Sequence, residues 1–253
     1  MLRFPIPRSK PPMNSALSVT VVIPTLCESA RIGGLLQALS EQEYDGPLQI
    51  IVVDGGSEDG TPAVVQHFPQ VLCLTGERGT ARQRNAGARV AQGELLIFMD
   101  ADNHPGPHFV RDVAHSFRRL PFGVACPWFV ARESAAIRTA YFGFNVLFWL
   151  GQSTLRTGSG VCLIAPRAVW QKCGGFRDDL HLGEDVEFLR RAARYGWHRH
   201  LLIGLETSGR RFERDGVVSL LRFYARISPL ILLGRWDALQ KLEYRASGES
   251  KQK

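Results

Sequence analysis

Four short apolar runs alternate with helix-like segments through the first part of the chain. The runs span residues 19–23, 50–53, 71–74 and 95–99. Helical spacing or helix-start signals lie between them at residues 29–44, from residue 61 onward, and at 81–91. Each run is apolar throughout rather than at alternate positions, which is typical of strands buried on both faces of a parallel sheet. The alternation predicts an α/β fold with a mostly parallel central sheet flanked by helices.

The pattern is looser after residue 102. Further helices are expected at residues 108–120, from 167, at 184–195 and at 217–233, and further strands at 124–130 and 161–164. The first 18 residues contain four prolines and lack the apolar stretch of a signal peptide. We expect a disordered leader (1–17), one α/β domain (18–210), a helical C-terminal extension (211–246) and a disordered tail (247–253).

The net charge of +7 suits an anionic partner, such as a nucleotide diphosphate, a nucleic acid or a bilayer with acidic lipids. The five cysteines are odd in number and form no C-x-x-C pair, which argues against a disulfide framework and a structural zinc site. No apolar run reaches the roughly 18–20 residues of a membrane-spanning helix, so we expect a cytoplasmic protein.

Two apolar stretches, at residues 141–150 and 217–233, have arginines in or near them. Such stretches can lie in the plane of a membrane interface, which would make the protein peripheral at the inner face of a membrane. Core packing or burial in a homodimer explains stretches of this length more often. All three interpretations stay open at the level of the sequence.

Acidic side chains follow two of the predicted strands directly. Asp100 and Asp102 come after the fourth run, and Asp54 after the second, where Gly55 and Gly56 permit close approach of a ligand. Ligands of open α/β sheets bind at the carboxyl ends of the strands. Paired carboxylates there suit Mg²⁺ or Mn²⁺ bound to the phosphates of a nucleotide, although Asp also favours plain turns. The Asp54 segment fits a glycine turn entering a helix equally well.

Four segments together resemble the family 2 glycosyltransferases, from about residue 19 to about residue 204: IPTLCES, VVDGGSEDGT, FMDAD and GED. Where that family usually has Asn, this chain has Cys27. The segments RGTARQRNAGARVAQGE and TSGRRFERDGV resemble a narrower bacterial branch of transferases linked to radical-SAM and selenium-domain gene neighbourhoods. The resemblance implies the nucleotide-sugar-binding fold called GT-A.

The resemblance also implies roles for individual residues. The nucleoside pocket would be lined by Pro24, Thr25, Glu28 and Asp54. Asp100 would lie near the ribose or sugar, Asp102 would bind the metal, and Arg84 and Asn85 would lie beside the donor. Glu184 and Asp185 match the motif whose aspartate acts as the general base of an inverting transfer, although acidic residues also favour the first turn of any helix.

Three arginines near the end of the expected domain, Arg210, Arg211 and Arg214, could clamp a diphosphate, since guanidinium groups match phosphate oxygens. A solvated basic loop or a contact with acidic lipids would use the same residues. The overall prediction is a metal-dependent transfer of sugar from a nucleotide-diphosphate sugar to a hydroxyl acceptor, which would be a small molecule, a glycan or a lipid-linked molecule.

Two rival functions are considered. A nucleotidyltransferase that makes sugar nucleotides usually has a phosphate loop rich in glycine and lysine, and PTLCESARIGG contains no lysine. A non-catalytic nucleotide- or RNA-binding protein would suit the charge of +7, but the chain has no RNP-type aromatic signature, and no nucleic acid partner is expected.

Overall fold

The computed structural model describes residues 16–154 and 156–242, in a single mixed sheet with helices on both faces. The predicted leader and tail lie outside these residues, apart from residues 16 and 17, of which Leu17 is buried in the core. The strands are β1 (Val19–Thr25), β2 (Leu48–Asp54), β3 (Val71–Thr75), β4 (Leu95–Met99), β5 (Asn103–Pro105), β6 (Val124–Val130), β7 (Cys162–Pro166) and β8 (His198–Thr207). The helices are α1 (Ser29–Ser40), α2 (Thr61–Gln66), α3 (Thr80–Val90), α4 (Phe109–Arg119), α5 (Ala135–Gly151), α6 (Arg167–Cys173), α7 (Glu184–Ala192), α8 (Arg210–Asp215), α9 (Val217–Leu232) and α10 (Trp236–Gln240).

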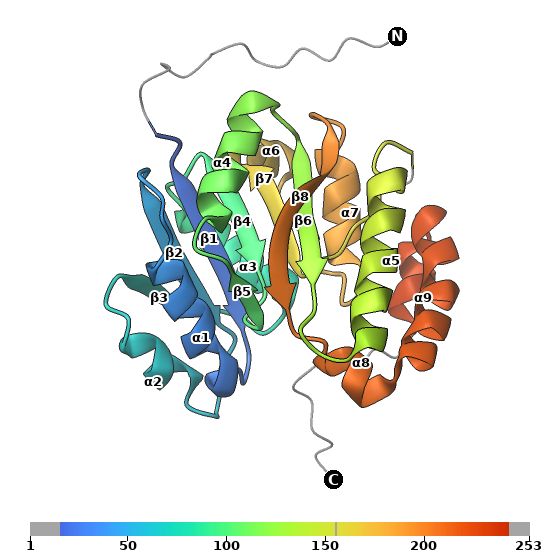
Figure 1. Cartoon of the computed structure of the whole chain (residues 1–253), viewed down its shortest axis with the longest axis horizontal. Coiled ribbons are helices and arrows are strands. Elements are labelled where there is room, and N and C mark those ends of the chain that lie inside the picture. The colour runs from blue at the N-terminus through green and yellow to red at the C-terminus, as the bar shows by residue number, and fades with distance from the viewer. Residues whose placement is uncertain (1–15, 155, 243–253) are drawn as a thin grey trace.

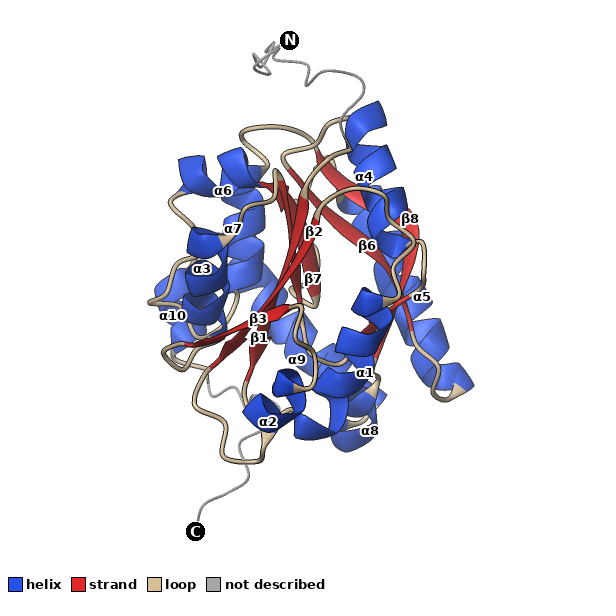
Figure 2. Cartoon of the chain, turned by 90° about the vertical axis from the view of Figure 1, so that its left-hand side faces the viewer, coloured by secondary structure: helices blue, strands red, loops and turns tan. Residues whose placement is uncertain are grey.

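The first four strands follow the sequence prediction. They pair in the order β3-β2-β1-β4, and every pair among them is parallel. All five residues of β4 are buried, as its uninterrupted apolar run indicates. Figure 2 shows helices on both faces of the sheet, with α3, α6 and α7 on one side and α1, α4 and α5 on the other. The carboxyl ends of β1, β2 and β4 therefore meet at one edge.

The second half of the sheet corrects the prediction that the sheet is mostly parallel. Its order is β7-β6-β8-β5, and β7 is antiparallel to both β4 and β6, as is β5 to β8. Only β6 and β8 are parallel in this half. A continuous apolar run reports burial on both faces, not the direction of the neighbouring strand, so this mixture could not be read from hydrophobicity.

The C-terminal helices cover the second half of the molecule. Helices α5 and α9 lie side by side, and α8 connects β8 to α9 (Figure 1). Helix α9 contains the predicted segment 217–233 up to Leu232, while residues 141–150 fall inside α5. Among residues 16–154 and 156–242, no helix combines the length and apolar character that crossing a bilayer requires.

Candidate functional site

Arg84 of α3 joins three segments at the carboxyl edge of the sheet. Its side chain is only 2% exposed. One terminal nitrogen (Nη2) donates to Asp100 Oδ1 at 3.0 Å and to the carbonyl of Gly160 at 2.7 Å. The other (Nη1) lies 3.5 Å from Glu184 Oε1, at the start of α7. Because a buried guanidinium is stable only when it is paired, these contacts fix the two acidic motifs relative to each other.

The charged groups around Arg84 shift one another's pKa values. The pKa of Asp100 is raised to about 6, chiefly by burial; Arg84 opposes this shift, and Asp102 and Asp185 add to it. Burial also raises the pKa of Glu184, together with Asp185 and against the pull of Arg84. The Arg84 pKa lies above its usual value, since the surrounding carboxylates outweigh the effect of burial. The Asp100 side chain keeps 37% of its surface exposed, so a ligand can reach it.

Arg210 of α8 links Asp102 to Glu28. Its Nε lies 3.2 Å from Asp102 Oδ2, and its two terminal nitrogens donate to the two carboxylate oxygens of Glu28 at 2.8 and 3.3 Å. Burial raises the pKa of Asp102, and Arg210 lowers it. Arg210 is thus bound to acidic groups here, where the sequence predicted a diphosphate clamp. The side chain of Arg211 lies outside the part of the structure that is described.

The loop after β2 is held by its own aspartate. Each oxygen of Asp54 accepts two hydrogen bonds, from Thr25, Gly56 and the amide and hydroxyl of Ser57. The buried amide of Gln83 donates to the carbonyls of Thr25 and Val53, both at 2.7 Å, and so ties the ends of β1 and β2 together. The glycine-turn interpretation of this segment fits these contacts. Gln83 was not singled out from the sequence, although it directly precedes Arg84.

Asn85 does not face the edge where the carboxylates gather. Its side-chain amide donates to the carbonyl of Phe176 at 2.8 Å, and its oxygen accepts from the amide of the same residue at 2.8 Å. Both polar groups of this buried side chain are therefore committed to the backbone between α6 and α7. Asn85 therefore supports the backbone next to Arg84, and its place beside the donor stays a prediction from the sequence.

Asp185 lies beside a glycine that the sequence did not single out. A Cβ atom added to Gly160 would approach Asp185 Oδ2 to 2.3 Å, so only glycine fits against this carboxylate. Gly160 also supplies the carbonyl that Arg84 binds. The site therefore depends on the loop before β7 as well as on the acidic motifs.

Helix α10 holds the turn that precedes Glu184 and Asp185. Gln240 Oε1 accepts from the backbone amides of His181 at 2.6 Å and Leu182 at 3.3 Å, and its Nε2 donates to the carbonyl of Leu182 at 2.9 Å. Gly183 follows with a φ of +82°, which favours glycine, and a Cβ atom there would meet Leu239 at 2.8 Å. No local pattern in the sequence could have indicated this contact, because it joins segments almost sixty residues apart.

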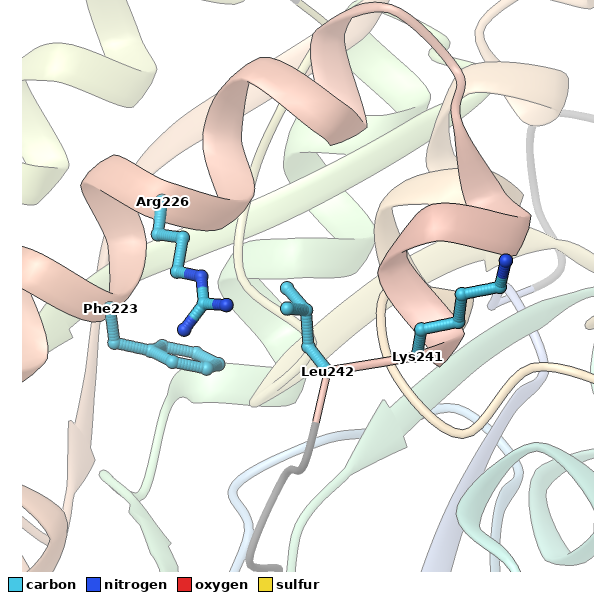
Figure 3. A pocket seen from close by; sticks show the side chains of 4 residues that line it. All are labelled: Phe223, Arg226, Lys241 and Leu242. Atoms are coloured by element: carbon cyan, nitrogen blue, oxygen red, sulfur yellow. The ribbon is translucent and has the colours of Figure 1, made fainter.

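A cavity of about 310 Å³ opens at Asp102. It is lined among others by Asp102, His104, Arg132, Glu133, Glu206 and Ser208. A larger cavity, of about 430 Å³, lies away from the carboxylates between α9 and the residues that follow α10 (Figure 3). We therefore assign the acidic cavity, and not the larger one, to the chemistry.

The acidic residues fit a metal only in part. Carboxylate oxygens such as those of Asp100 and Asp102 suit Mg²⁺ or Mn²⁺. Within the described ranges, however, no group of three or more His, Cys, Asp or Glu side chains is arranged to hold an ion. An ion at Asp102 would therefore need further oxygens from a ligand, as the phosphates of a nucleotide provide.

Solved structures of similar shape confirm the GT-A fold. TarS 1–349 of S. aureus in complex with UDP has a TM-score of 0.63 at 20% identity, over 76% of this chain and 60% of that one. Mannosyltransferase PcManGT from Pyrobaculum calidifontis, in complex with GDP-Man and Mn²⁺, has a TM-score of 0.59 at 22% identity, over 89% of this chain and 72% of that one.

Curated relatives match parts of the chain. An N-acetylglucosaminyltransferase of Rhizobium leguminosarum bv. viciae is 27% identical over 221 residues, which cover 79% of this chain and 50% of the relative. The uncharacterized glycosyltransferase YfnE of Bacillus subtilis is 37% identical over 91 residues, 34% of this chain and 23% of YfnE. The chain thus spans half or less of the length of these two relatives.

Two family profiles match the chain. That of glycosyl transferase family 2 covers residues 20–157, more than half of the sequence, and that of glycosyl transferase family group 2 covers residues 95–226. The first match includes β1 to β4, Arg84 and the Asp100–Asp102 segment, and the second includes Glu184, Asp185 and Arg210. On this evidence the chain belongs to glycosyl transferase family 2.

Proposed function

We propose that this protein transfers a sugar from a nucleoside diphosphate sugar to a hydroxyl acceptor. The observation that carries the proposal is the Arg84 contact network, which joins Asp100 to Glu184, while Asp102, two residues after Asp100, lines the cavity of about 310 Å³. The printed names of relatives and neighbours support it, since they include N-acetylglucosaminyltransferases and complexes with UDP, UDP-GlcNAc and GDP-Man.

The donor would lie along the carboxyl edge of β1, β2 and β4. We assign the nucleoside pocket to Pro24, Thr25, Glu28 and Asp54. Asp100 would face the ribose or sugar, and Asp102 would hold Mg²⁺ or Mn²⁺, which supplies positive charge to the diphosphate as it leaves. Arg210, which is bound to Asp102 and Glu28 in the structure, would move to the phosphate oxygens, where a guanidinium also binds well.

Asp185 is our candidate for the general base. It would take the proton of the acceptor hydroxyl while that oxygen bonds to the anomeric carbon and the bond to the diphosphate breaks. Attack from the face opposite the diphosphate inverts the anomeric centre. Glu184 lies 3.5 Å from the guanidinium of Arg84, and we assign it to positioning within the catalytic motif through that contact.

The branch of the family, the acceptor class and the domain bounds are proposed from the sequence and from the names of relatives. The segments around Arg84 and Arg210 support membership of the branch linked to radical-SAM and selenium-domain genes. The name of TarS, a poly(ribitol-phosphate) β-N-acetylglucosaminyltransferase, supports a glycan or polyol acceptor. Residues 18–210 would form the transferase domain and residues 211–246 its extension. The cytoplasmic location remains a prediction from the sequence.

Donor binding can be tested by calorimetry with UDP and GDP in the presence of Mn²⁺. We expect one of them to bind, and we expect EDTA or Asp102→Asn to abolish binding, because Asp102 would hold the ion. Asp112→Asn, which changes an aspartate in α4, serves as the matched control and should leave binding unchanged. Binding that persists in EDTA and in Asp102→Asn would favour a non-catalytic nucleotide-binding protein.

The role of Asp185 can be tested by release of UDP from UDP-GlcNAc, or of GDP from GDP-mannose, with water as the acceptor. Asp185→Asn should bind the nucleotide as the wild type does but turn over about 10²- to 10⁴-fold more slowly, which is the usual contribution of a general base. Equal turnover by the two proteins would contradict the assignment of the base.

A further inference from the structure

Helices α5 and α9 lie side by side and form one surface of the molecule. Ile137 and Leu220, near the starts of the two helices, belong to one buried cluster, and the rings of Phe144 and Tyr224 meet edge to face at 5.4 Å further along. The helices therefore run in the same direction, and their C-terminal ends lie at the same end of the surface (Figure 1). We call this surface the α5–α9 face.

Large apolar side chains point outward from this face. On α5, Leu147 is 51% exposed, Trp149 43% and Leu150 66%; Phe142 is exposed as well, with its ring 6.0 Å from that of Trp128. At the end of α9, Leu232 and Leu233 are also exposed. Scattered apolar side chains are normal on a protein surface, but a group on two adjacent helices marks a place where something binds.

The charge of the face is of one sign. Neither helix contains Asp or Glu, whereas Arg138, Arg222 and Arg226 are all exposed. Arginine can lay its alkyl chain along an apolar surface and extend its charge to the rim. Two copies of a purely cationic face would repel each other across a symmetric interface, so the charges disfavour a second copy as the occupant and favour an acidic surface.

The cavity of about 430 Å³ adjoins this face at Arg226. Phe223 and Arg226 of α9 line one side of it, and Lys241 and Leu242, just after α10, line the other (Figure 3). Within the described part of the chain, Arg226 and Lys241 form no ion pair with an acidic residue. In Figure 3 the guanidinium of Arg226 lies near Phe223 and Leu242, whereas the ammonium of Lys241 points away from them. A guanidinium beside two apolar side chains matches the junction of a phosphate headgroup and an acyl chain.

We propose that the α5–α9 face docks onto a bilayer that contains acidic lipids, with the cavity beside Arg226 receiving a lipid headgroup. The apolar side chains would enter the interface and the arginines would pair with lipid phosphates, as in amphipathic helices that lie in the membrane plane. This proposal stands on the exposed surface and does not depend on the proposed transfer reaction.

Flotation with vesicles of phosphatidylcholine, with and without about 30% phosphatidylglycerol, tests the proposal on the full chain. We expect the wild type to bind the acidic vesicles at least about 10-fold better than the neutral ones, and to lose this preference at high salt. Trp149→Ser combined with Leu150→Ser should lower binding about 10-fold, and so should Arg222→Gln combined with Arg226→Gln.

The matched control is Leu72→Ser combined with Val90→Ser, which removes exposed apolar side chains from β3 and α3 at the other end of the sheet. It should bind vesicles as the wild type does. The arginine variant changes only exposed polar groups, so it keeps the test valid even if the apolar variant does not fold. Absence of wild-type binding, equal loss in the control, or a dimer in sedimentation that binds no vesicles would overturn the proposal.

Discussion

The two halves of the sheet differ in how they are built and in what surrounds them. In the first half, β1 to β4 are all parallel and follow one another with short helices between them. In the second half, β5 to β8 mix directions, and two of the longest helices expose apolar side chains. The first half has the structure of a nucleotide-binding sheet, and the second half supplies the surroundings in which relatives of the same fold can differ.

The residues with chemistry come from both halves. Arg84 and Asp100 belong to the first half, whereas Gly160 and Glu184 belong to the second. We call this Arg84 contact network the junction. The comparison teaches that neither half contains a complete site, so the geometry of the site depends on how firmly the two halves are joined.

The largest expected effect follows from removing the cation of the junction. Arg84→Met leaves two carboxylates near the edge of the core without their partner, and this should lower the free energy of unfolding by about 1–3 kcal/mol, because water reaches Asp100, which is 37% exposed, and screens its charge. Urea unfolding measures the change. Arg89→Met, on the exposed side of the same helix, should have almost no effect. If the two variants unfold alike, charge does not hold the halves together.

The second half should be the more sensitive to acid. Burial lowers the pKa of His198 and of His200 on β8 to about 4. Unfolded histidine titrates near pH 6.5, so between pH 6.5 and pH 4 the unfolded chain binds more protons and stability falls as the pH falls. From pH 7 to pH 5 the loss would be about 2 kcal/mol for each histidine, while the raised pKa values of Asp100 and Glu184 act in the opposite direction, so the contribution of a histidine is the difference between the wild type and a variant that lacks it.

Urea unfolding at the two pH values measures this loss. His200→Phe should flatten the dependence, because it removes the titrating group; the ring lies among Trp128, Phe129 and Phe148, which suit a phenyl group, although the variant loses the 3.1 Å contact of Nε2 with Asn145 Oδ1. An unchanged slope in this variant would show that other groups cause the acid sensitivity. The one histidine of the first half, His67, is exposed and serves as the control position.

A smaller effect is expected where α10 holds the turn before Glu184. Gln240→Ala removes three hydrogen bonds to His181 and Leu182. Since each contributes roughly 0.5–1.5 kcal/mol, amide exchange of residues 181–186 should rise by at least about 10-fold. Turnover should fall while nucleotide binding stays constant. Gln240→Glu keeps both acceptor contacts and should recover part of the loss, whereas Lys241→Ala should behave as the wild type.

The smallest effect concerns the first half. Cys27 has a φ of +54°, a region that Asn tolerates better than other non-glycine residues. Cys27→Asn should therefore raise the free energy of unfolding by up to about 1 kcal/mol. Thermal unfolding can detect it, and Cys73→Asn in β3 should show no gain. A lower melting temperature for Cys27→Asn would mean that the thiol has contacts that outweigh the backbone strain.

The same comparison explains what the sequence could predict. The first half was predictable because uninterrupted apolar runs and helix-start signals are local, and the acidic residues directly follow the strands. The antiparallel direction of β7, the short strand β5 and helix α10 could not be predicted from the sequence. The contacts that hold the site together could not be predicted either, because they join residues far apart in the sequence. The separation is 76 residues between Arg84 and Gly160, 91 between Asn85 and Phe176, and 182 between Arg210 and Glu28. Such contacts are set by the tertiary structure alone.

The contact of Arg210 with Asp102 and Glu28 has a consequence for affinity. Arg210 serves as a counter-ion to Asp102 and Glu28, so a donor that arrives with a metal ion would exchange one cation for another instead of neutralising free carboxylates. Only the difference between the two arrangements would then appear as binding free energy. Removing the Arg210 side chain would therefore change donor affinity by less than the loss of a phosphate contact alone would suggest.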